Sequence, residues 1–103
     1  MKRVIFSSDL KPTGEITRLR YCNAYIRVDE YNYFEFISYN TIIMAGRLSE
    51  RRGYIDYVEF FPYCSMTTWA HVRKFCYLFG NGGTVYSKYR EAARGKIRSA
   101  RFF

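Results

Sequence analysis

One stretch of the chain carries the signals of an α-helix at both of its ends: Ser65-Met66-Thr67-Thr68-Trp69-Ala70-His71-Val72-Arg73-Lys74-Phe75-Cys76-Tyr77-Leu78-Phe79-Gly80. Hydroxyl side chains at its start can accept hydrogen bonds from the free amides of a first turn, and Gly80 suits the left-handed residue that follows a helix. Four apolar residues fall on one stripe at spacings of three, four and three: Trp69, Val72, Cys76 and Phe79. The stretch therefore predicts an amphipathic helix over residues 67–79, which needs a flat apolar surface to pack on.

Short segments before this helix are typical of the β-strands that would supply such a surface. They are rich in β-branched and aromatic residues, are separated by turn residues, and cover residues 4–6, 24–28, 33–39, 41–46 and 54–61. Beyond the helix, residues 84–86 are predicted as a last edge strand. The pattern favours a single small α+β domain in which an antiparallel sheet of four or five strands packs on one central α-helix.

Alternation along two of these strands predicts which side chains share a face of the sheet. In residues 33–39, one face holds Phe34, Phe36 and Ser38, and the other holds Tyr33, Glu35, Ile37 and Tyr39. In residues 54–61, one face holds Ile55, Tyr57 and Phe61, and the other holds Asp56, Val58 and Phe60. The first strand thus has a clearly apolar face, whereas the second has apolar residues on both.

The net charge of +8 is concentrated near the C-terminus. Residues 88–101 contain six basic side chains and one acidic one, a net charge of +5, whereas residues 1–87 contain 11 basic and 8 acidic ones, a net charge of +3. We therefore divide the chain into an α+β domain over residues 1–87 and a basic C-terminal extension over residues 88–103. Residues 88–94 of the extension form a predicted short helix, and Ile97, Phe102 and Phe103 could dock the remainder.

The cysteines and the N-terminus predict a cytoplasmic protein. The three cysteines, Cys22, Cys64 and Cys76, are odd in number and have no C-x-x-C spacing, so we interpret them as buried thiols in a reducing compartment. The apolar run near the N-terminus has three residues, too few for a signal peptide, and no run approaches the ~18 residues of a membrane span. No cofactor motif is recognised, and the oligomeric state stays open.

Basic side chains interleaved with tyrosine predict a surface for an anionic partner, because rings can stack on bases while cations neutralise phosphates. The candidate binding residues are Arg47, Arg51 and Arg52 in a charged hairpin loop, and Lys88, Tyr89, Arg90, Arg94, Lys96, Arg98 and Arg101 near the C-terminus. The alternative is a solvated basic terminus that keeps the protein soluble. No sequence-specific nucleic-acid motif is present, so no sequence specificity is predicted.

His71 is the only histidine, and we predict a structural role for it together with Thr67 and Thr68, in fixing the start of the helix. It has no cysteine or aspartate at ligand spacing, which argues against a metal site. The carboxylates Glu35, Asp56 and Glu59 would suit a metal-dependent nuclease if they gathered in space. Cross-strand pairing with arginines is the simpler interpretation, so we predict no metal and no catalytic residue.

Two segments resemble a group of small uncharacterised proteins from bacteriophages and mobile elements. They are Ser38-Tyr39-Asn40-Thr41 and Ser65-Met66-Thr67-Thr68-Trp69-Ala70-His71-Val72-Arg73-Lys74-Phe75, which are similar to that group's S-Y-x-T and S-x-T-T-x-x-H-x-x-x-F patterns. The resemblance implies a small α+β domain of phage or mobile-element origin and implies no particular activity. It does not extend to the basic C-terminal residues.

The leading hypothesis is a non-enzymatic phage accessory protein that binds nucleic acid or a host nucleoprotein through its basic, tyrosine-rich surfaces. The alternative, drawn from analogy with small phage proteins, is a protein-directed inhibitor of host defence machinery, similar to anti-CRISPR proteins. A metal-dependent nuclease is the third and weakest hypothesis.

Overall fold

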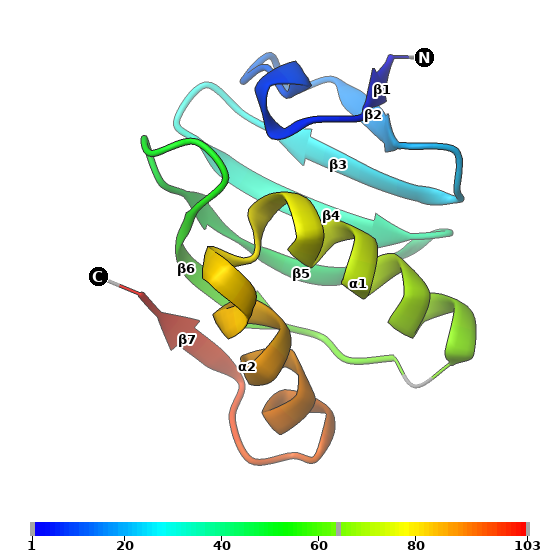
Figure 1. Ribbon diagram of the computed structural model, residues 1–103, viewed down its shortest axis with the longest axis vertical. Helices are drawn as coiled ribbons and strands as arrows, with labels where there is room; N and C mark the ends of the chain where they lie inside the picture. The colour runs from blue at the N-terminus through cyan, green and yellow to red at the C-terminus, as the bar shows by residue number, and fades with distance from the viewer. Residues whose placement is uncertain (1, 64, 103) are drawn as a thin grey trace.

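The computed structural model describes residues 2–63 and 65–102, and these form one sheet with two helices. The strands lie side by side in their order along the chain: β1 (Arg3–Val4), β2 (Ile16–Leu19), β3 (Ala24–Val28), β4 (Tyr33–Ser38), β5 (Thr41–Leu48), β6 (Ile55–Phe60) and β7 (Ser99–Arg101). β1 and β2 run parallel, and every other neighbouring pair is antiparallel. Figure 1 shows this sheet behind the helices.

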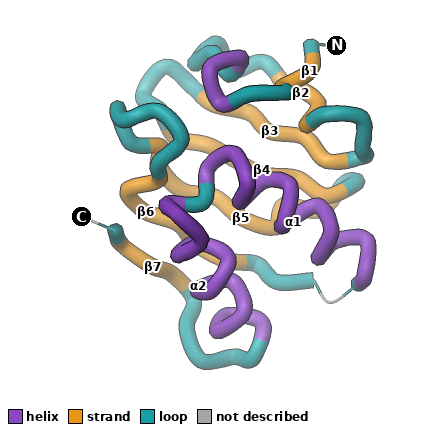
Figure 2. Tube along the Cα trace, in the orientation of Figure 1, coloured by secondary structure: helices purple, strands orange, loops and turns teal. Residues whose placement is uncertain are grey.

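The helices cover one face of the sheet and leave the other uncovered (Figures 1 and 2). They are α1 (Met66–Phe79) and α2 (Thr84–Ala93), and the short 3-10 helices η1 (Ser7–Asp9) and η2 (Asn81–Gly83) lie in connections. We call the side of the sheet under α1 and α2 the covered face, and the opposite side the open face.

Alternation along the strands explains the core, because every second side chain points to the covered face. Those residues, with the inner sides of the helices, are buried: Val4, Leu19, Ala24, Ile26, Val28, Phe34, Phe36, Ile43, Met44, Ile55, Val58, Phe60, Val72, Phe75, Phe79, Val85, Tyr89 and Ala92. The ring of Phe75 is at the centre of an aromatic group, with its centroid 4.5 Å from that of Phe36 and 5.7 Å from that of Phe34. The face predicted for Phe34, Phe36 and Ser38 is confirmed as buried.

A bulge between β5 and β6 changes the faces predicted for the second strand. Arg47 pairs with Tyr57 but Leu48 pairs with Ile55, so one extra residue, Asp56, interrupts the alternation. Ile55 and Val58 both point into the core as a result. Tyr57 lies on the open face. The prediction that Ile55 and Tyr57 share a face is therefore wrong.

The start of α1 is fixed by a small buried group of hydroxyls and one imidazole. Ser65 is the N-cap and accepts a hydrogen bond from the Thr68 amide at 3.0 Å. Ser38 of β4 shares hydrogen bonds with His71 Nδ1 at 2.8 Å and with Thr68 Oγ1 at 3.3 Å. The predicted roles of Thr68 and His71 agree with this geometry, whereas Thr67 is exposed and lies outside it. The two segments of the S-Y-x-T and S-x-T-T-x-x-H-x-x-x-F patterns therefore meet here.

The end of α1 differs from the expectation. Gly80 has φ −93° and is not left-handed. It is required instead by close packing, because a Cβ at Gly80 would lie 1.9 Å from the carbonyl oxygen of Cys76. The positive φ values follow at Asn81 (51°) and Gly83 (96°), which turn the chain into α2.

The α+β class is confirmed, but over the described residues the sheet has seven strands where four or five were predicted, and two helices pack on it where one central helix was predicted. The short helix predicted over residues 88–94 lies largely within α2. The predicted strand at residues 84–86 is wrong, since these residues begin α2. Val85, Tyr89 and Ala92 bury one side of that helix at a spacing of four and three.

The division of the chain at residue 87 is corrected by the same elements, because it falls inside α2. The expected basic extension is packed into the domain: β7 pairs with β6, and Ile97 and Phe102 contact the core. Phe103 lies outside the described residues. Among the described residues, no helix is long and apolar enough to cross a membrane.

Candidate binding surface

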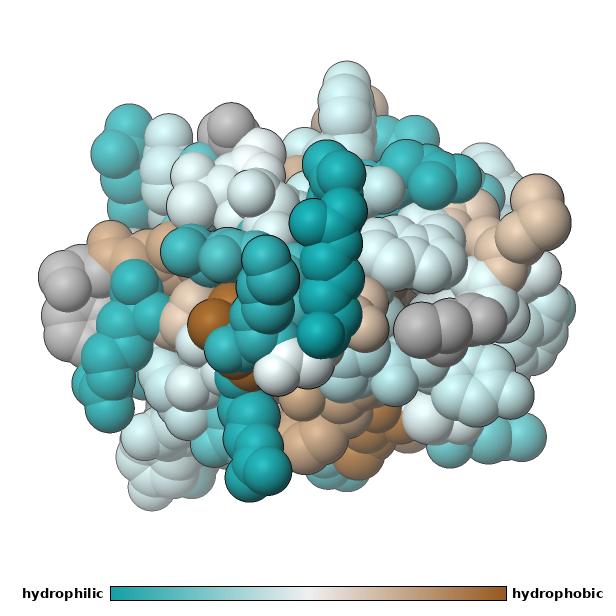
Figure 3. Space-filling model, turned by 90° about the horizontal axis from the view of Figure 1, so that it is seen from below, coloured by the Kyte–Doolittle hydropathy of each residue, from teal (hydrophilic) through white to brown (hydrophobic). Residues whose placement is uncertain are grey.

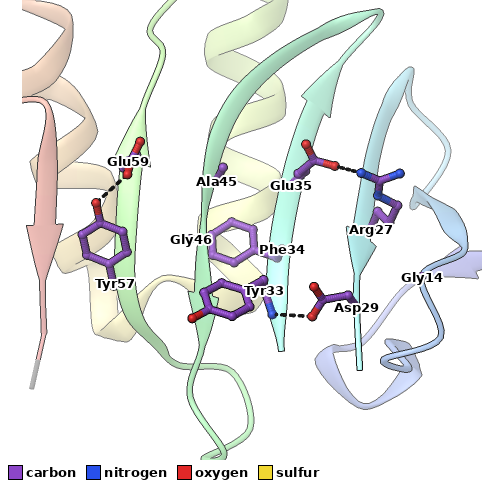
Figure 4. A pocket seen from close by; sticks show the side chains of 10 residues that line it. All are labelled: Gly14, Arg27, Asp29, Tyr33, Phe34, Glu35, Ala45, Gly46, Tyr57 and Glu59. Carbon is purple, nitrogen blue, oxygen red and sulfur yellow. Dashed lines mark hydrogen bonds and ion pairs between the residues drawn. The ribbon is translucent and has the colours of Figure 1, made fainter. Parts of the chain in front are cut away.

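The open face of the sheet is built from arginine, tyrosine and carboxylate side chains. The strand register places arginines on it from β1, β2, β3, β5 and β7: Arg3, Arg18, Arg27, Arg47 and Arg101. Tyr25, Tyr33 and Tyr57 stand among them. The helices lie on the other side of the sheet, and Figure 4 shows Arg27, Tyr33 and Tyr57 on the open face.

Four of these side chains form one row across the sheet. Tyr33 pairs with Arg47, Arg47 pairs with Tyr57, and Tyr57 pairs with Arg101. We call these four residues the tyrosine–arginine row. Neighbouring strands lie about 4.8 Å apart, so the two tyrosine positions are separated by about 10 Å with an arginine between them. The Arg101 guanidinium lies over the Tyr57 ring, with its carbon 5.1 Å from the ring centroid. The similar contact of Arg3 with Tyr21 measures 4.9 Å.

A shallow hollow lies beside the row, above small residues of β5. Ala45 forms its floor between Glu35 of β4 and Glu59 of β6, because it pairs with both. Gly46 allows β5 and β6 to approach closely, since a Cβ at this position would lie 2.0 Å from the carbonyl oxygen of Tyr57. Figure 4 shows Tyr33 and Tyr57 standing at one end of this hollow and the two glutamates at the other.

The carboxylates of the open face all have partners. Glu35 forms an ion pair with Arg27, and Asp56 lies 3.9 Å from Arg47. Tyr57 donates a 2.7 Å hydrogen bond to Glu59, which raises the pKa of the Tyr57 hydroxyl above its usual value. The cross-strand pairing with arginine predicted for Glu35 and Asp56 is confirmed, whereas Glu59 is hydrogen-bonded to Tyr57 of its own strand. Within the part of the chain that the structure describes, no group of three His, Cys, Asp or Glu side chains could hold a metal ion.

A second hollow continues from the first and leads to the loop between α2 and β7. The two share Tyr57 and Glu59, and the second is also lined by Phe61, Ile97 and Arg98. We call the two hollows together the groove. Figure 3 views the molecule from the end where this loop lies and shows hydrophilic side chains crowded there, with apolar surface between them.

The ten predicted binding residues are distributed over five places. Arg47 and Arg101 belong to the tyrosine–arginine row, and Arg94, Lys96 and Arg98 lie in or next to the loop at the end of the groove. Lys88 and Arg90 lie on α2, where Lys88 pairs with Glu91 at 3.2 Å. Arg51 and Arg52 lie in the β5–β6 loop, near the opposite end of the molecule in Figure 1, and Arg51 covers the Tyr54 ring. Tyr89 lies in the core.

Tyr89 is therefore corrected as a binding residue. Its side chain is 1 % exposed, and its ring packs edge-on against Trp69 at 5.0 Å and Phe60 at 5.9 Å. Its hydroxyl accepts a hydrogen bond from the Tyr63 amide. A ring enclosed in this way stabilises α2 on the sheet and cannot stack on a ligand.

Sequence reasoning did not identify Tyr33 and Tyr57 as surface residues of one site. Alternation along residues 33–39 placed Tyr33 on the face opposite Phe34, and this was the one sign in the sequence that Tyr33 is exposed. For Tyr57 the β5–β6 bulge removed that signal, because the face could not be inferred from a period of two. Pairing of both tyrosines with Arg47 depends on the register of the consecutive strands β4, β5 and β6, which the turns and the bulge set.

Charge is distributed very unevenly between the first and last parts of the chain. The first 60 residues contain nine basic and eight acidic side chains, a net charge of +1. From residue 61 onward there are eight basic side chains and one acidic one, Glu91, a net charge of +7. The positive field therefore comes from α1, α2, the α2–β7 loop and β7.

The cysteines contribute no evident chemistry to this surface. Cys22 and Cys76 are free and partly buried, and Cys64 lies outside the described residues. Burial raises the pKa of the Cys76 thiol to about 12, so it is protonated and unreactive at neutral pH.

Compared with known protein families, with curated proteins and with solved structures, the chain matches none of them.

Proposed function

We propose that this protein is a non-enzymatic nucleic-acid-binding protein that holds phosphates on the cations around the α2–β7 loop. The observation that carries the proposal is the net charge of +7 after residue 60, with Glu91 as its single carboxylate. Three of these cations, Arg94, Lys96 and Arg98, lie close together in sequence at the end of the groove and are exposed. The resemblance to small phage and mobile-element proteins suits such a role and would make the ligand phage or host nucleic acid.

Phosphate binding has a physical signature that separates it from other kinds of contact. Each phosphate that a cation neutralises releases condensed counterions, so the affinity falls as salt rises. The slope of log affinity against log salt is about −0.7 per phosphate for a single strand. A site that neutralises several phosphates should give a steep slope, whereas a contact that neutralises none should give a shallow one.

The test is binding of fluorescein-labelled oligonucleotides of about 16 nucleotides, measured by fluorescence anisotropy between about 50 mM and about 200 mM salt. The variant Arg94→Gln/Lys96→Gln/Arg98→Gln should bind more weakly and lose up to about 2 units of slope. The comparison variant, Lys11→Gln/Arg51→Gln/Arg52→Gln, removes the same number of charges from around the β5–β6 loop and tests whether the predicted residues Arg51 and Arg52 belong to the phosphate site. It should retain most of the affinity. Wild-type protein that fails to bind at low salt, or binds without a slope, contradicts the proposal.

A second candidate function, inhibition of a host defence protein, is favoured by the composition of the open face. The strands of the described residues contain five arginines and no lysine, and tyrosines stand between them. Arginine and tyrosine are enriched in protein interfaces, where lysine is depleted. Capture of one host protein by the tagged chain, unchanged after nuclease treatment and lost in Arg47→Ala/Tyr57→Ala, would support this function over the first.

A further inference from the structure

The tyrosine–arginine row is the feature of the open face that charge alone does not explain. Surface charge for solubility requires no aromatic rings, yet Tyr33 is 56 % exposed and Tyr57 stands beside it across β5. Packing does not require them either, because the core lies on the other side of the sheet. An exposed ring on a rigid strand at the edge of a hollow is the arrangement found where flat ligands stack.

We propose that the tyrosine–arginine row binds unpaired bases, so that the ligand of this protein is single-stranded nucleic acid. This inference rests on the proposed function and names its ligand more closely. A base in a duplex is stacked on both faces and offers no free ring surface. Only an unpaired base can lie on a tyrosine ring or on an arginine guanidinium plane.

The spacing of the row suits a strand that crosses the sheet. The Tyr33 and Tyr57 positions lie about 10 Å apart, which leaves the Arg47 side chain between two stacked bases. Arg47 is 47 % exposed and its nearest carboxylate oxygen, on Asp56, is 3.9 Å away. This contact is too long for a strong hydrogen bond, so the guanidinium can turn to a phosphate at little cost. The Arg101 guanidinium covers one face of the Tyr57 ring, so a base stacks on the other face of the ring or on the guanidinium plane itself.

The charges around the row indicate where the phosphates run. Glu35 and Glu59 on either side of Ala45 repel phosphate from the centre of the hollow. Cations stand at the margins: Arg27 on β3, Arg101 on β7 and Arg98 at the end of the groove. A strand with its bases over the rings and its phosphates along these margins satisfies both sets of charges.

Stacking is tested by variants that separate the ring from the hydroxyl. Tyr33→Leu/Tyr57→Leu removes both rings, whereas Tyr33→Phe/Tyr57→Phe keeps the rings and removes the hydrogen bond to Glu59. Tyr77→Leu is the matched control, because Tyr77 is 78 % exposed on α1, on the side of the molecule opposite the row. The ligands are an oligothymidylate of about 16 nucleotides and a duplex of equal length.

We expect wild-type protein to bind the single strand more tightly than the duplex. The double leucine variant removes two stacking rings and should lose at least about 30-fold in single-strand affinity, while its duplex affinity and its circular dichroism spectrum stay unchanged. The double phenylalanine variant and Tyr77→Leu should bind the single strand within about threefold of wild type, because base stacking requires the ring alone.

Three outcomes would overturn the inference, and they are distinguishable from failure of the proposed function. If wild type binds neither ligand, the proposed function fails first. If it binds both equally, or if the double leucine variant retains full single-strand affinity, nucleic-acid binding stands but the row is not its base site. If the wild type is dimeric by analytical ultracentrifugation and the leucine variant is monomeric with unchanged affinity, the row is a contact between two copies of the chain.

Discussion

The two faces of the sheet are made by the same strands but carry different chemistry. On the covered face, Phe34, Phe36 and Ser38 of β4 are buried beneath α1. On the open face, Tyr33 and Glu35 alternate with them along the same strand and reach solvent. Because strand side chains alternate, the fold places constraints on one face and leaves the other free for a ligand. The contrast teaches that folding and binding can be altered independently in this protein.

The largest change in stability should follow removal of an aromatic ring from the covered face. Phe75→Ala should lower the free energy of unfolding by about 3–5 kcal/mol, because it leaves a cavity between Phe36 and Phe79. Tyr33→Ala, which removes a comparable ring from the open face, should change it by about 0.5 kcal/mol or less. Urea unfolding followed by circular dichroism measures both. A large loss for Tyr33→Ala would mean that the open face also stabilises the fold.

The same contrast explains which parts of the structure could be predicted from the sequence. Periodicity identified β3, β4 and α1 almost to the residue, since each buries one clear face. It failed at residues 84–86, whose β-branched and aromatic side chains favour a strand but which join a helix buried through Val85 and Tyr89. Local propensity was overridden there by tertiary packing.

The binding surface was predicted in part, for a related reason. Clustered cations such as Arg94, Lys96 and Arg98 are visible in sequence because they are neighbours in the chain. The tyrosine–arginine row joins residues as far apart as Tyr33 and Arg101, and its members meet through strand register. Register depends on the turns and on the β5–β6 bulge, and composition does not reveal it.

A smaller effect should come from His71, which is 3 % exposed at the start of α1. Burial, and then the charge of Lys74, lowers the pKa of His71 below its ordinary value of 6.5. The unfolded chain therefore binds a proton at a higher pH than the folded protein does. The stability that His71 contributes is present above pH 6.5 and is lost as the pH falls below it toward the lower pKa of the folded state.

Urea unfolding between about pH 7.5 and about pH 5.5 measures this dependence, a range in which few carboxylates titrate. Wild-type protein should become less stable as the pH is lowered. His71→Gln should be less stable at the higher pH, because the contact with Ser38 is changed, but its stability should vary less across the range. Equal pH dependence in the two proteins would show that a group other than His71 is responsible.

The smallest effect on stability should separate two hydroxyl residues at the start of α1, one that caps the helix and one that is exposed. Ser65 and Thr67 both carry hydroxyls at the start of α1, but only Ser65 caps the helix by accepting from the Thr68 amide. Ser65→Ala should cost about 1 kcal/mol of unfolding free energy because that amide loses its acceptor. Thr67 is exposed within the first turn. Thr67→Ala should therefore leave stability unchanged or raise it by a few tenths of a kcal/mol, since alanine has the higher helix propensity. Equal losses of unfolding free energy in the two variants would mean that the Thr67 hydroxyl also stabilises the first turn of α1, although it is exposed.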